Sequence, residues 1–165
     1  MDETPDPFAP LLADHEDFGE KLMELEATLD EMMASRGATV ANRELIDEAI
    51  RFLEEELVPH FRREEEIVLP PIAARIGRFG SLVNVVMYEH DEIRRELRKL
   101  KESRDVLAES PDPWPAIQEL NRHGIFTIQF LADHFRKERT SLFPTARADL
   151  SSEELARMRA GLDRR

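Results

Sequence analysis

Two histidine and glutamate pairs in the sequence have a spacing that suits metal binding. His60 is followed four residues later by Glu64, and His134 is followed at the same distance by Glu138. On a helix, residues four apart share one face, so each pair presents an imidazole beside a carboxylate. These ligand types, in a chain without cysteine, suit iron, manganese or zinc.

The two pairs belong to copies of a longer repeat. The segments HFRREEEIVLP, from His60, and HFRKERTSLFP, from His134, share His, Phe, Arg, Glu and Pro at equivalent positions. Upstream, DHEDF around His15 matches EHDEI around His90. The repeat predicts a duplicated helical hairpin, with each half contributing two histidines and one glutamate. Closing the halves around a pseudo-twofold axis favours two metal ions bridged by two carboxylates, as in di-iron or di-manganese centres.

A structural role is the alternative for each of these residues taken alone, because a single histidine on a buried helix face is more often hydrogen-bonded than metal-bound. Six ionisable groups in one core, however, would carry a heavy desolvation cost without a partner, and a dication is a suitable partner. We therefore expect one metal site built from the following side chains: His15, His60, Glu64, His90, His134 and Glu138.

Two neighbouring residues are assigned other roles. His123 lies three turns before His134, which is about 16 Å along a helix and too far for the same metals. Glu56, one turn before His60, could accept a hydrogen bond from a ligand histidine, although a solvated side chain is the more frequent role on so acidic a helix.

The residues that flank His90 are expected to be peripheral. Tyr88 is predicted to pack against its surroundings, and the runs Glu65-Glu66 and Arg94-Arg95 are most simply solvated faces. Arg94, one turn after His90, could stabilise a bound anionic oxygen species, although an ion pair with a glutamate on a neighbouring helix is the more ordinary outcome.

The elements that would position these residues are all helical. Apolar residues recur at steps of three and four, with the candidate ligands filling gaps in the apolar stripes. Thr39 or Asn42 can cap the second helix, Asp112 the fourth with Pro113 at its first position, and Ser151 and Glu154 form a capping box for a tail helix. Pro59 should kink the second helix, and the fourth should end at about Pro144.

The inward positions follow from the same periodicity. They are Leu11, Phe18, Leu22, Leu25, Leu29 and Met32; Ile46, Ile50 or Leu53, Leu57 and Ile67; Val83, Val86, Ile93, Leu97, Leu100 and Leu107; and Ile117, Leu120, Gly124, Thr127 and Leu131. Short connections predict an all-α, up-down-up-down antiparallel four-helix bundle. We divide the chain into an acidic, Pro-rich segment (1–10), the bundle (11–147) and the tail helix (148–165).

Composition limits the function. The 165 residues suit one domain, and a net charge of −12 would repel a phosphate backbone, so nucleic acid is not an expected partner. Without cysteine, any redox role must rest on a metal or cofactor. No apolar run approaches the ~20 residues that cross a bilayer, and the first residues are acidic rather than basic and apolar, so a cytoplasmic protein is expected.

The six residues, in this order and spacing, resemble the hemerythrin-like, or HHE cation-binding, family. The likeness extends from His15 to Pro144 and includes the endings Leu69-Pro70 and Phe143-Pro144. The resemblance implies that the four histidines are terminal ligands of two irons, and that the two glutamates bridge them alongside an oxo or hydroxo group. Manganese or zinc could substitute.

One departure bears on function. Oxygen-carrying hemerythrins use a fifth histidine four residues after the third-helix ligand, where this chain has Arg94. Simple oxygen carriage is therefore less expected than the chemistry of the similar bacterial branch, which is linked to repair of iron centres and to nitric oxide or peroxide stress.

Three functions follow from these observations. A di-iron site with open positions could react with dioxygen, peroxide or nitric oxide. The bundle could instead be an iron- or oxygen-responsive sensor for an unknown protein partner, or a metal store or carrier. A structural bundle with accidental histidines is the third possibility; ferritin-like sites use Glu-x-x-His, which this chain does not follow.

Overall fold

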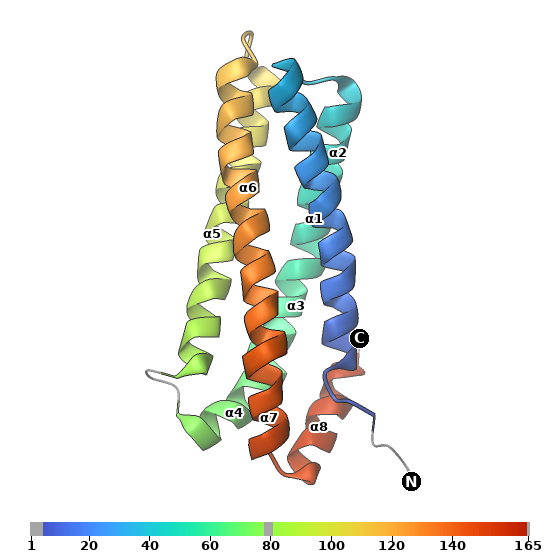
Figure 1. Ribbon diagram of the computed structural model, residues 1–165, viewed down its shortest axis with the longest axis vertical. Coiled ribbons are helices and arrows are strands. Elements are labelled where there is room, and N and C mark those ends of the chain that lie inside the picture. Colours follow the sequence, from blue (N-terminus) through green and yellow to red (C-terminus); the bar gives the residue numbers. More distant parts are fainter. Residues whose placement is uncertain (1–4, 78–80, 165) are drawn as a thin grey trace.

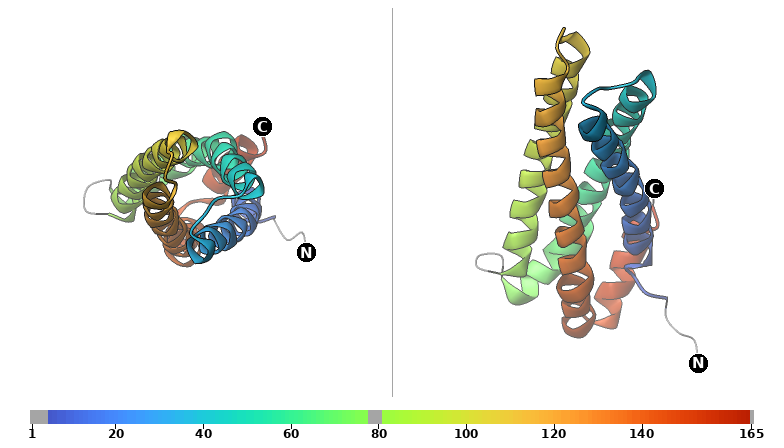
Figure 2. Two further views of the ribbon diagram at one scale, coloured as in Figure 1. Left: turned by 90° about the horizontal axis from the view of Figure 1, so that it is seen from above. Right: turned by 45° about the horizontal axis from the view of Figure 1, so that its top comes forward.

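The computed structural model describes residues 5–77 and 81–164, which form an antiparallel four-helix bundle with a short additional helix (Figure 1). No strand occurs in this part of the chain. The first and third rods are single helices, α1 (Ala9–Ser35) and α5 (Leu82–Glu109). Viewed along the bundle, the rods enclose a common centre (Figure 2). The predicted all-α bundle and its tail helix are confirmed.

The second and fourth rods are interrupted by π-helical turns. The second contains α2 (Val40–Phe52), η1 (Leu53–Leu57), α3 (Val58–Arg63), η2 (Glu64–Val68) and α4 (Leu69–Ile76). The fourth contains α6 (Trp114–Lys137), η3 (Glu138–Leu142) and α7 (Phe143–Asp149), and α8 (Ser152–Leu162) follows it.

Each π-helical turn ends two residues before a proline. The N–H groups of Val58, Leu69 and Phe143 donate to the carbonyls five residues earlier, those of Leu53, Glu64 and Glu138. Proline lacks an N–H and its ring clashes with the carbonyl four residues back, so a wider turn accommodates it without ending the helix.

The wider turns correct two predictions. The fourth rod does not end at Pro144 but continues through α7 to Asp149. In the second rod, the extra residue of η2 rotates the chain that follows, so that Val68 is fully buried and Ile67, the predicted core residue, is only half-buried. The bend expected at Pro59 corresponds to η1, which precedes that proline.

The caps agree with the sequence at two of three sites. Thr39 and Asn42 form a capping box at the start of α2, and Ser151 and Glu154 form one at the start of α8. The fourth rod begins one residue later than predicted, because Pro113 occupies the cap position and Trp114 is the first helical residue. The Asp112 carboxylate still accepts a hydrogen bond from the Trp114 N–H at 3.2 Å.

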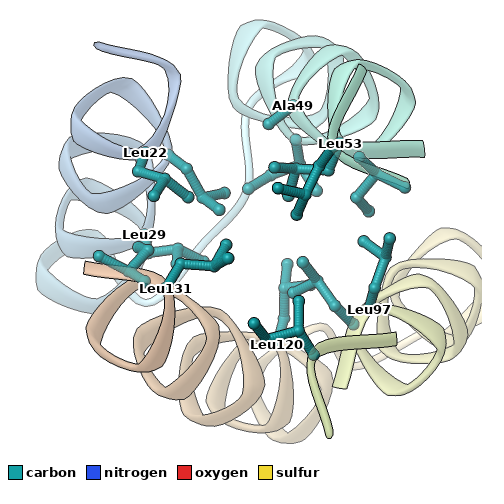
Figure 3. Packing of buried hydrophobic residues seen from close by; sticks show 14 of the residues in the cluster. Leu22, Leu29, Ala49, Leu53, Leu97, Leu120 and Leu131 are labelled. Carbon is teal, nitrogen blue, oxygen red and sulfur yellow. The ribbon is translucent and has the colours of Figure 1, made fainter. Parts of the chain in front are cut away.

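The apolar core consists of two clusters. The upper cluster in Figure 1 contains the buried apolar residues of α1 from Phe18 onward, of the second rod up to Phe61, of α5 from Ile93 onward, and of α6. Figure 3 shows several of its leucines pointing toward the bundle centre. The lower cluster comprises Phe8, Leu11, Val68, Leu69, Ile72, Val83, Val86, Leu142, Phe143, Ala146, Leu150, Met158 and Leu162. On every rod, a candidate metal ligand lies between the two.

The first described residues join this lower cluster. Helix α1 begins at Ala9, two residues before the predicted start at Leu11. Phe8 is fully buried and stacks on Phe143, with ring centroids 4.5 Å apart, while Arg147 binds the Asp6 carboxylate at 2.6 Å. Helix α8 covers the same end through Met158 and Leu162.

Candidate metal centre

The six predicted site residues converge in the layer between the two apolar clusters. Their potential ligand atoms form two groups, within each of which all atoms lie inside 4.8 Å of one another. The first group is His15, His60, Glu64 and Glu138, and the second is Glu64, His90, His134 and Glu138. All six residues are buried, and the two glutamates belong to both groups. Each group has the residue types and the proximity that a metal ion requires.

Glu64 faces one histidine of each group with a different oxygen. Its Oε1 lies 3.0 Å from Nε2 of His60, and its Oε2 lies 3.1 Å from Nε2 of His90. Oε1 of Glu138 lies 3.2 Å from Nε2 of His134 and 3.4 Å from Nε2 of His15. Glu64 thus presents a different oxygen to a histidine of each group, whereas Glu138 presents the same oxygen to a histidine of each group.

The inward atoms of this layer have no hydrogen-bond partner among the described residues. They are Nδ1 and Nε2 of His15, Nε2 of His60, His90 and His134, and both carboxylate oxygens of Glu64 and Glu138. The approaches of 3.0–3.4 Å are close, but the groups are not oriented as donor and acceptor. Ligands at right angles around one ion, each about 2.1 Å from it, lie about 3 Å apart. The buried polar atoms therefore fit a metal ion better than they fit each other.

The outward nitrogens of three histidines contact carboxylates from other helices. Nδ1 of His60 lies 2.9 Å from Asp14, Nδ1 of His90 lies 2.8 Å from Glu65, and Nδ1 of His134 lies 2.7 Å from Glu89. An acceptor at Nδ1 fixes the ring so that Nε2 faces the centre, and it raises the basicity of Nε2.

The sequence prediction missed these three acceptors. The one proposed, Glu56, is exposed, while Glu65 does not belong to a solvated face as predicted. The repeat could have indicated two of the acceptors, because Asp14 immediately precedes His15 and Glu89 immediately precedes His90. Each acid binds the histidine of the adjacent rod instead of its neighbour in sequence.

Each acceptor carboxylate also has a cationic partner. Asp14 pairs with Arg63, Glu89 pairs with Lys137, and Glu65 pairs with Arg94 at 2.9 Å. Arg94 therefore forms the ion pair with a neighbouring helix that was the simpler of its two predicted roles. Each of these three carboxylates is neutralised by its cation. The net charge of the buried layer therefore depends on the six candidate ligands themselves.

The pKa values reflect the crowding of these groups. Burial lowers the pKa of His15 to about 3, and the charge of His60 lowers it further. Burial also acts to lower the pKa of His60, but the charge of Glu64 and the hydrogen bond to Asp14 outweigh it and raise that pKa to about 9.

The pKa values of the two glutamates are likewise shifted in opposite directions. Burial acts to raise the pKa of Glu64, but the charge of His60 and its proximity hold this pKa well below its usual range. Burial and the adjacent Glu64 carboxylate raise the pKa of Glu138 well above its usual value. Two carboxylates that share a buried site disfavour each other's ionisation, and a cation between them would favour the charged form of both.

Phenylalanines from the repeat line the layer. Phe61 stacks on His90 with ring centroids 4.0 Å apart, and Phe135 stacks on His15 at 4.2 Å. Both phenylalanines are buried, and each follows a candidate ligand directly in sequence. They shield the imidazoles from water, which strengthens electrostatic interactions inside the layer.

Two peripheral predictions have different outcomes. His123 lies outside both ligand groups, as expected, with its Nδ1 3.0 Å from Glu96. Tyr88 does not pack as predicted, because it is 60% exposed.

A four-helix bundle with a buried layer of imidazoles and carboxylates defines a helical cation-binding protein. The family model described as the hemerythrin HHE cation-binding domain matches residues 6–146. The chain therefore belongs to the hemerythrin HHE family. A comparison with curated proteins found no matching relative. Among the described residues, no helix has both the length and the apolar character required to cross a membrane.

Proposed function

We propose that the chain binds two iron ions, with His15, His60, His90 and His134 as terminal ligands and with Glu64 and Glu138 as bridges. The observation that carries this proposal is the sharing of both glutamates by the two ligand groups. Helical bundles that hold two iron ions use bridging carboxylates in this way, and the absence of thiolates is compatible with iron.

The site would react with dioxygen, peroxide or nitric oxide. Bound iron would supply electrons to a small molecule, and six protein side chains would leave coordination positions open for it. The protein contributes orientation through Asp14, Glu65 and Glu89, which hold three imidazoles with Nε2 inward. It contributes water exclusion through Phe61 and Phe135.

Elemental analysis and rapid mixing test the proposal. Protein purified without a chelator or a histidine tag should contain about two irons per chain, the number that two ligand groups hold. After reduction, stopped-flow absorption should change on mixing with at least one of the three oxidants. A metal-free chain, or iron-loaded protein whose spectrum is unaffected by all three, would contradict it.

A sensor role is the second candidate, and it is favoured by the inward atoms that lack partners. Their ligation would couple metal binding to the stability of all four rods, and partner binding could respond to that change. Hydrogen exchange of the metal-free and iron-loaded forms tests this role. Equal protection of the rods in the two forms would exclude it.

A further inference from the structure

A surface cavity lies between α5 and α6, near the turn that joins them at the top of Figure 1, and we call it the hairpin cavity. Its volume is about 520 Å³, which is within the range of small-molecule sites in proteins. The described residues that line it include His123 but none of the six candidate metal ligands. His123 lies three helical turns from His134, about 16 Å along α6. The cavity is thus separate from the candidate metal layer.

Small residues between the two helices leave room for the cavity. Glu96 of α5 and His123 of α6 are in contact at 3.0 Å. Seven residues, or two turns, nearer the joining turn, α5 carries Ser103 and α6 carries Ala116, so these two residues face each other across the antiparallel pair. Both line the cavity, and their short side chains leave the space between the helices unfilled.

The part of the cavity nearest the joining turn is apolar and rigid. Ala116 is buried there, and Val106, Pro111 and Pro115 also line it. Val106 is 56% exposed, so an apolar group bound against it would remove apolar surface from water. The two prolines fix the backbone φ of the joining turn and of the first turn of α6, so the cavity is formed before a ligand binds.

His123 presents a hydrogen-bond acceptor at the other end of the cavity. Its Nδ1 lies 3.0 Å from Oε2 of Glu96, so a neutral ring donates there and leaves a lone pair on Nε2. Nε2 lies 3.6 Å from Oε2 of Glu119, which is beyond hydrogen-bond distance. Two acceptors side by side lack a donor between them, and a group with several N–H bonds can donate to both.

The charged residues around the cavity favour a cation. Three acids and one base line it: Glu102, Asp112, Glu119 and Lys99. Lys99 is already paired with Glu96 at 2.9 Å. Glu119 pairs with the exposed Arg122, whereas Glu102 is exposed and forms no ion pair with a described residue. The lining therefore carries a negative excess, in a chain whose net charge is −12.

The two helix ends that meet here do not reverse this preference. The C-terminal turn of α5 carries a partial negative charge, which favours a cation. The first turn of α6 carries the opposite partial charge, but the N–H of Trp114 already donates to Asp112 at 3.2 Å, and Pro115 has no N–H. An anion would therefore find few donors at this end of the cavity.

We propose that the hairpin cavity binds a small primary ammonium ion that carries a compact apolar group. The ammonium group donates to Nε2 of His123 and to the carboxylate of Glu119. The apolar group lies against Val106, Ala116 and Pro115. This site goes beyond the proposed function, because it needs neither the metal ions nor their ligands.

Calorimetric titration of the full chain with cyclohexylamine tests the proposal. Cyclohexanol and cyclohexanecarboxylate are the neutral and anionic analogues, and they retain the same apolar ring. The dissociation constant of the amine should be lower than that of either analogue by roughly fivefold or more, because only the amine donates a charge-assisted hydrogen bond. Trp114 is the single tryptophan of the chain and lies between the lining residues Asp112 and Pro115, so its fluorescence should change with the same dissociation constant.

Substitutions with opposite effects identify the contacts. Ser103→Leu fills the space between the helices with a helix-favouring side chain and should raise the dissociation constant roughly tenfold or more. Glu119→Gln removes a charged acceptor and should raise it severalfold. Arg122→Gln removes the cation that competes for Glu119 and should lower it about twofold.

Three matched variants serve as controls. Ala27→Leu and Glu26→Gln alter exposed residues of α1 outside the cavity, and Arg136→Gln removes an exposed cation of α6 that pairs with Asp133. All three should bind the amine as the unmodified chain does. Melting temperatures show which variants are folded, so that a loss of binding is not confused with unfolding.

Four results would overturn the assignment. They are an absence of amine binding, equal affinity for the amine and the carboxylate, unchanged binding in Ser103→Leu, and a Trp114 fluorescence that does not respond to the amine. An equal change in Arg122→Gln and Arg136→Gln would show that the amine responds only to the net charge of the chain, which also contradicts a defined site. None of these readouts depends on iron, so the inference can fail while the proposed function holds, and the reverse.

Discussion

Asp14 and His60 are 46 residues apart in sequence, yet a carboxylate oxygen of the first lies 2.9 Å from Nδ1 of the second. Glu89 and His134 repeat this relationship at 2.7 Å across 45 residues. In both halves, the acid before one candidate ligand orients the candidate ligand on the adjacent rod. The two rods of each hairpin are thus joined by a polar contact directly beside the centre.

Removing one of these carboxylates should weaken metal binding without removing a ligand. Asp14→Asn and Glu89→Gln lose the charge that orients and polarises an imidazole, and we expect metal affinity to fall by roughly 10–100-fold. Chelator competition measures this change. Asp17→Asn alters an exposed acid on the same helix as Asp14 and should have no effect. Equal affinity in all three variants would mean that the carboxylates are merely structural.

Substitutions of the candidate ligands should separate the two proposed metal positions. His15→Ala removes a side chain from one group only, so the metal content should fall toward one ion per chain. Glu64→Ala removes a side chain from both groups, so both ions should be lost. Elemental analysis gives the stoichiometry, and His123→Ala is the matched histidine control outside the layer. An unchanged metal content in Glu64→Ala would exclude the bridging role.

The metal-free protein should be most stable between about pH 4.5 and pH 6.5. The pKa of His15 is lowered from 6.5 to about 3, so its stabilising contribution is present above pH 6.5 and is lost as the pH falls toward 3. The pKa of His60 is raised from 6.5 to about 9, so its contribution is present below pH 6.5 and is lost as the pH rises through 9. The pKa of Glu138 is raised from 4.5, so its contribution is present below pH 4.5 and is lost as the pH rises, and between pH 4.5 and 6.5 it offsets the gain from His15.

Melting temperatures of chelator-treated protein across this pH range test the expectation. Declines above about pH 6.5 and below about pH 4.5 should be visible, since each kcal/mol shifts the melting temperature by roughly 2–4 °C in a chain of this size. Metal loading displaces the protons of His60 and Glu138, so the loaded form should lose the decline above pH 6.5. A melting temperature that rises steadily to pH 9 without metal would contradict the assignment.

Two glycines within helices should respond to alanine in opposite ways. At Gly19 a Cβ meets no atom within 4 Å, and Gly19→Ala should stabilise the protein by ~0.5–1 kcal/mol through helix propensity. At Gly124 a Cβ would lie 2.4 Å from Cδ1 of the fully buried Leu29, and Gly124→Ala should cost ~1–3 kcal/mol by overpacking. Denaturant titration gives both values, and a stabilised Gly124→Ala would show that Leu29 has room to move.

The helices and their buried faces could be predicted because apolar periodicity and capping residues are local signals. The spacing of His60 from Glu64 and of His134 from Glu138 likewise predicted that these side chains share one level, and the six residues do converge. That each is a metal ligand stays a prediction. The exchange of Ile67 for Val68 in the core could not be predicted from the α-helical period, because the wider turn before Pro70 changes the period itself.

The missed contacts have a different cause. Glu65 and Arg94 look like members of exposed charge runs, and only the packing of α5 against the second rod shows that they meet beside His90. Asp14 was visible in the repeat, but its hydrogen bond crosses to another rod, so no spacing along one helix indicates it. Glu56 was the natural candidate by spacing and points to solvent instead.

The polar layer divides the apolar core, and the part below it is built from the ends of all four rods together with Phe8 and α8. That lower portion has its own set of buried side chains, so it can unfold locally while the upper portion persists. Cations in the layer would link the two cooperative units. Removing the cations would first lower the free energy needed to unfold the lower unit locally. The amides of that unit would then lose their protection from hydrogen exchange before the amides around Leu29 and Leu120.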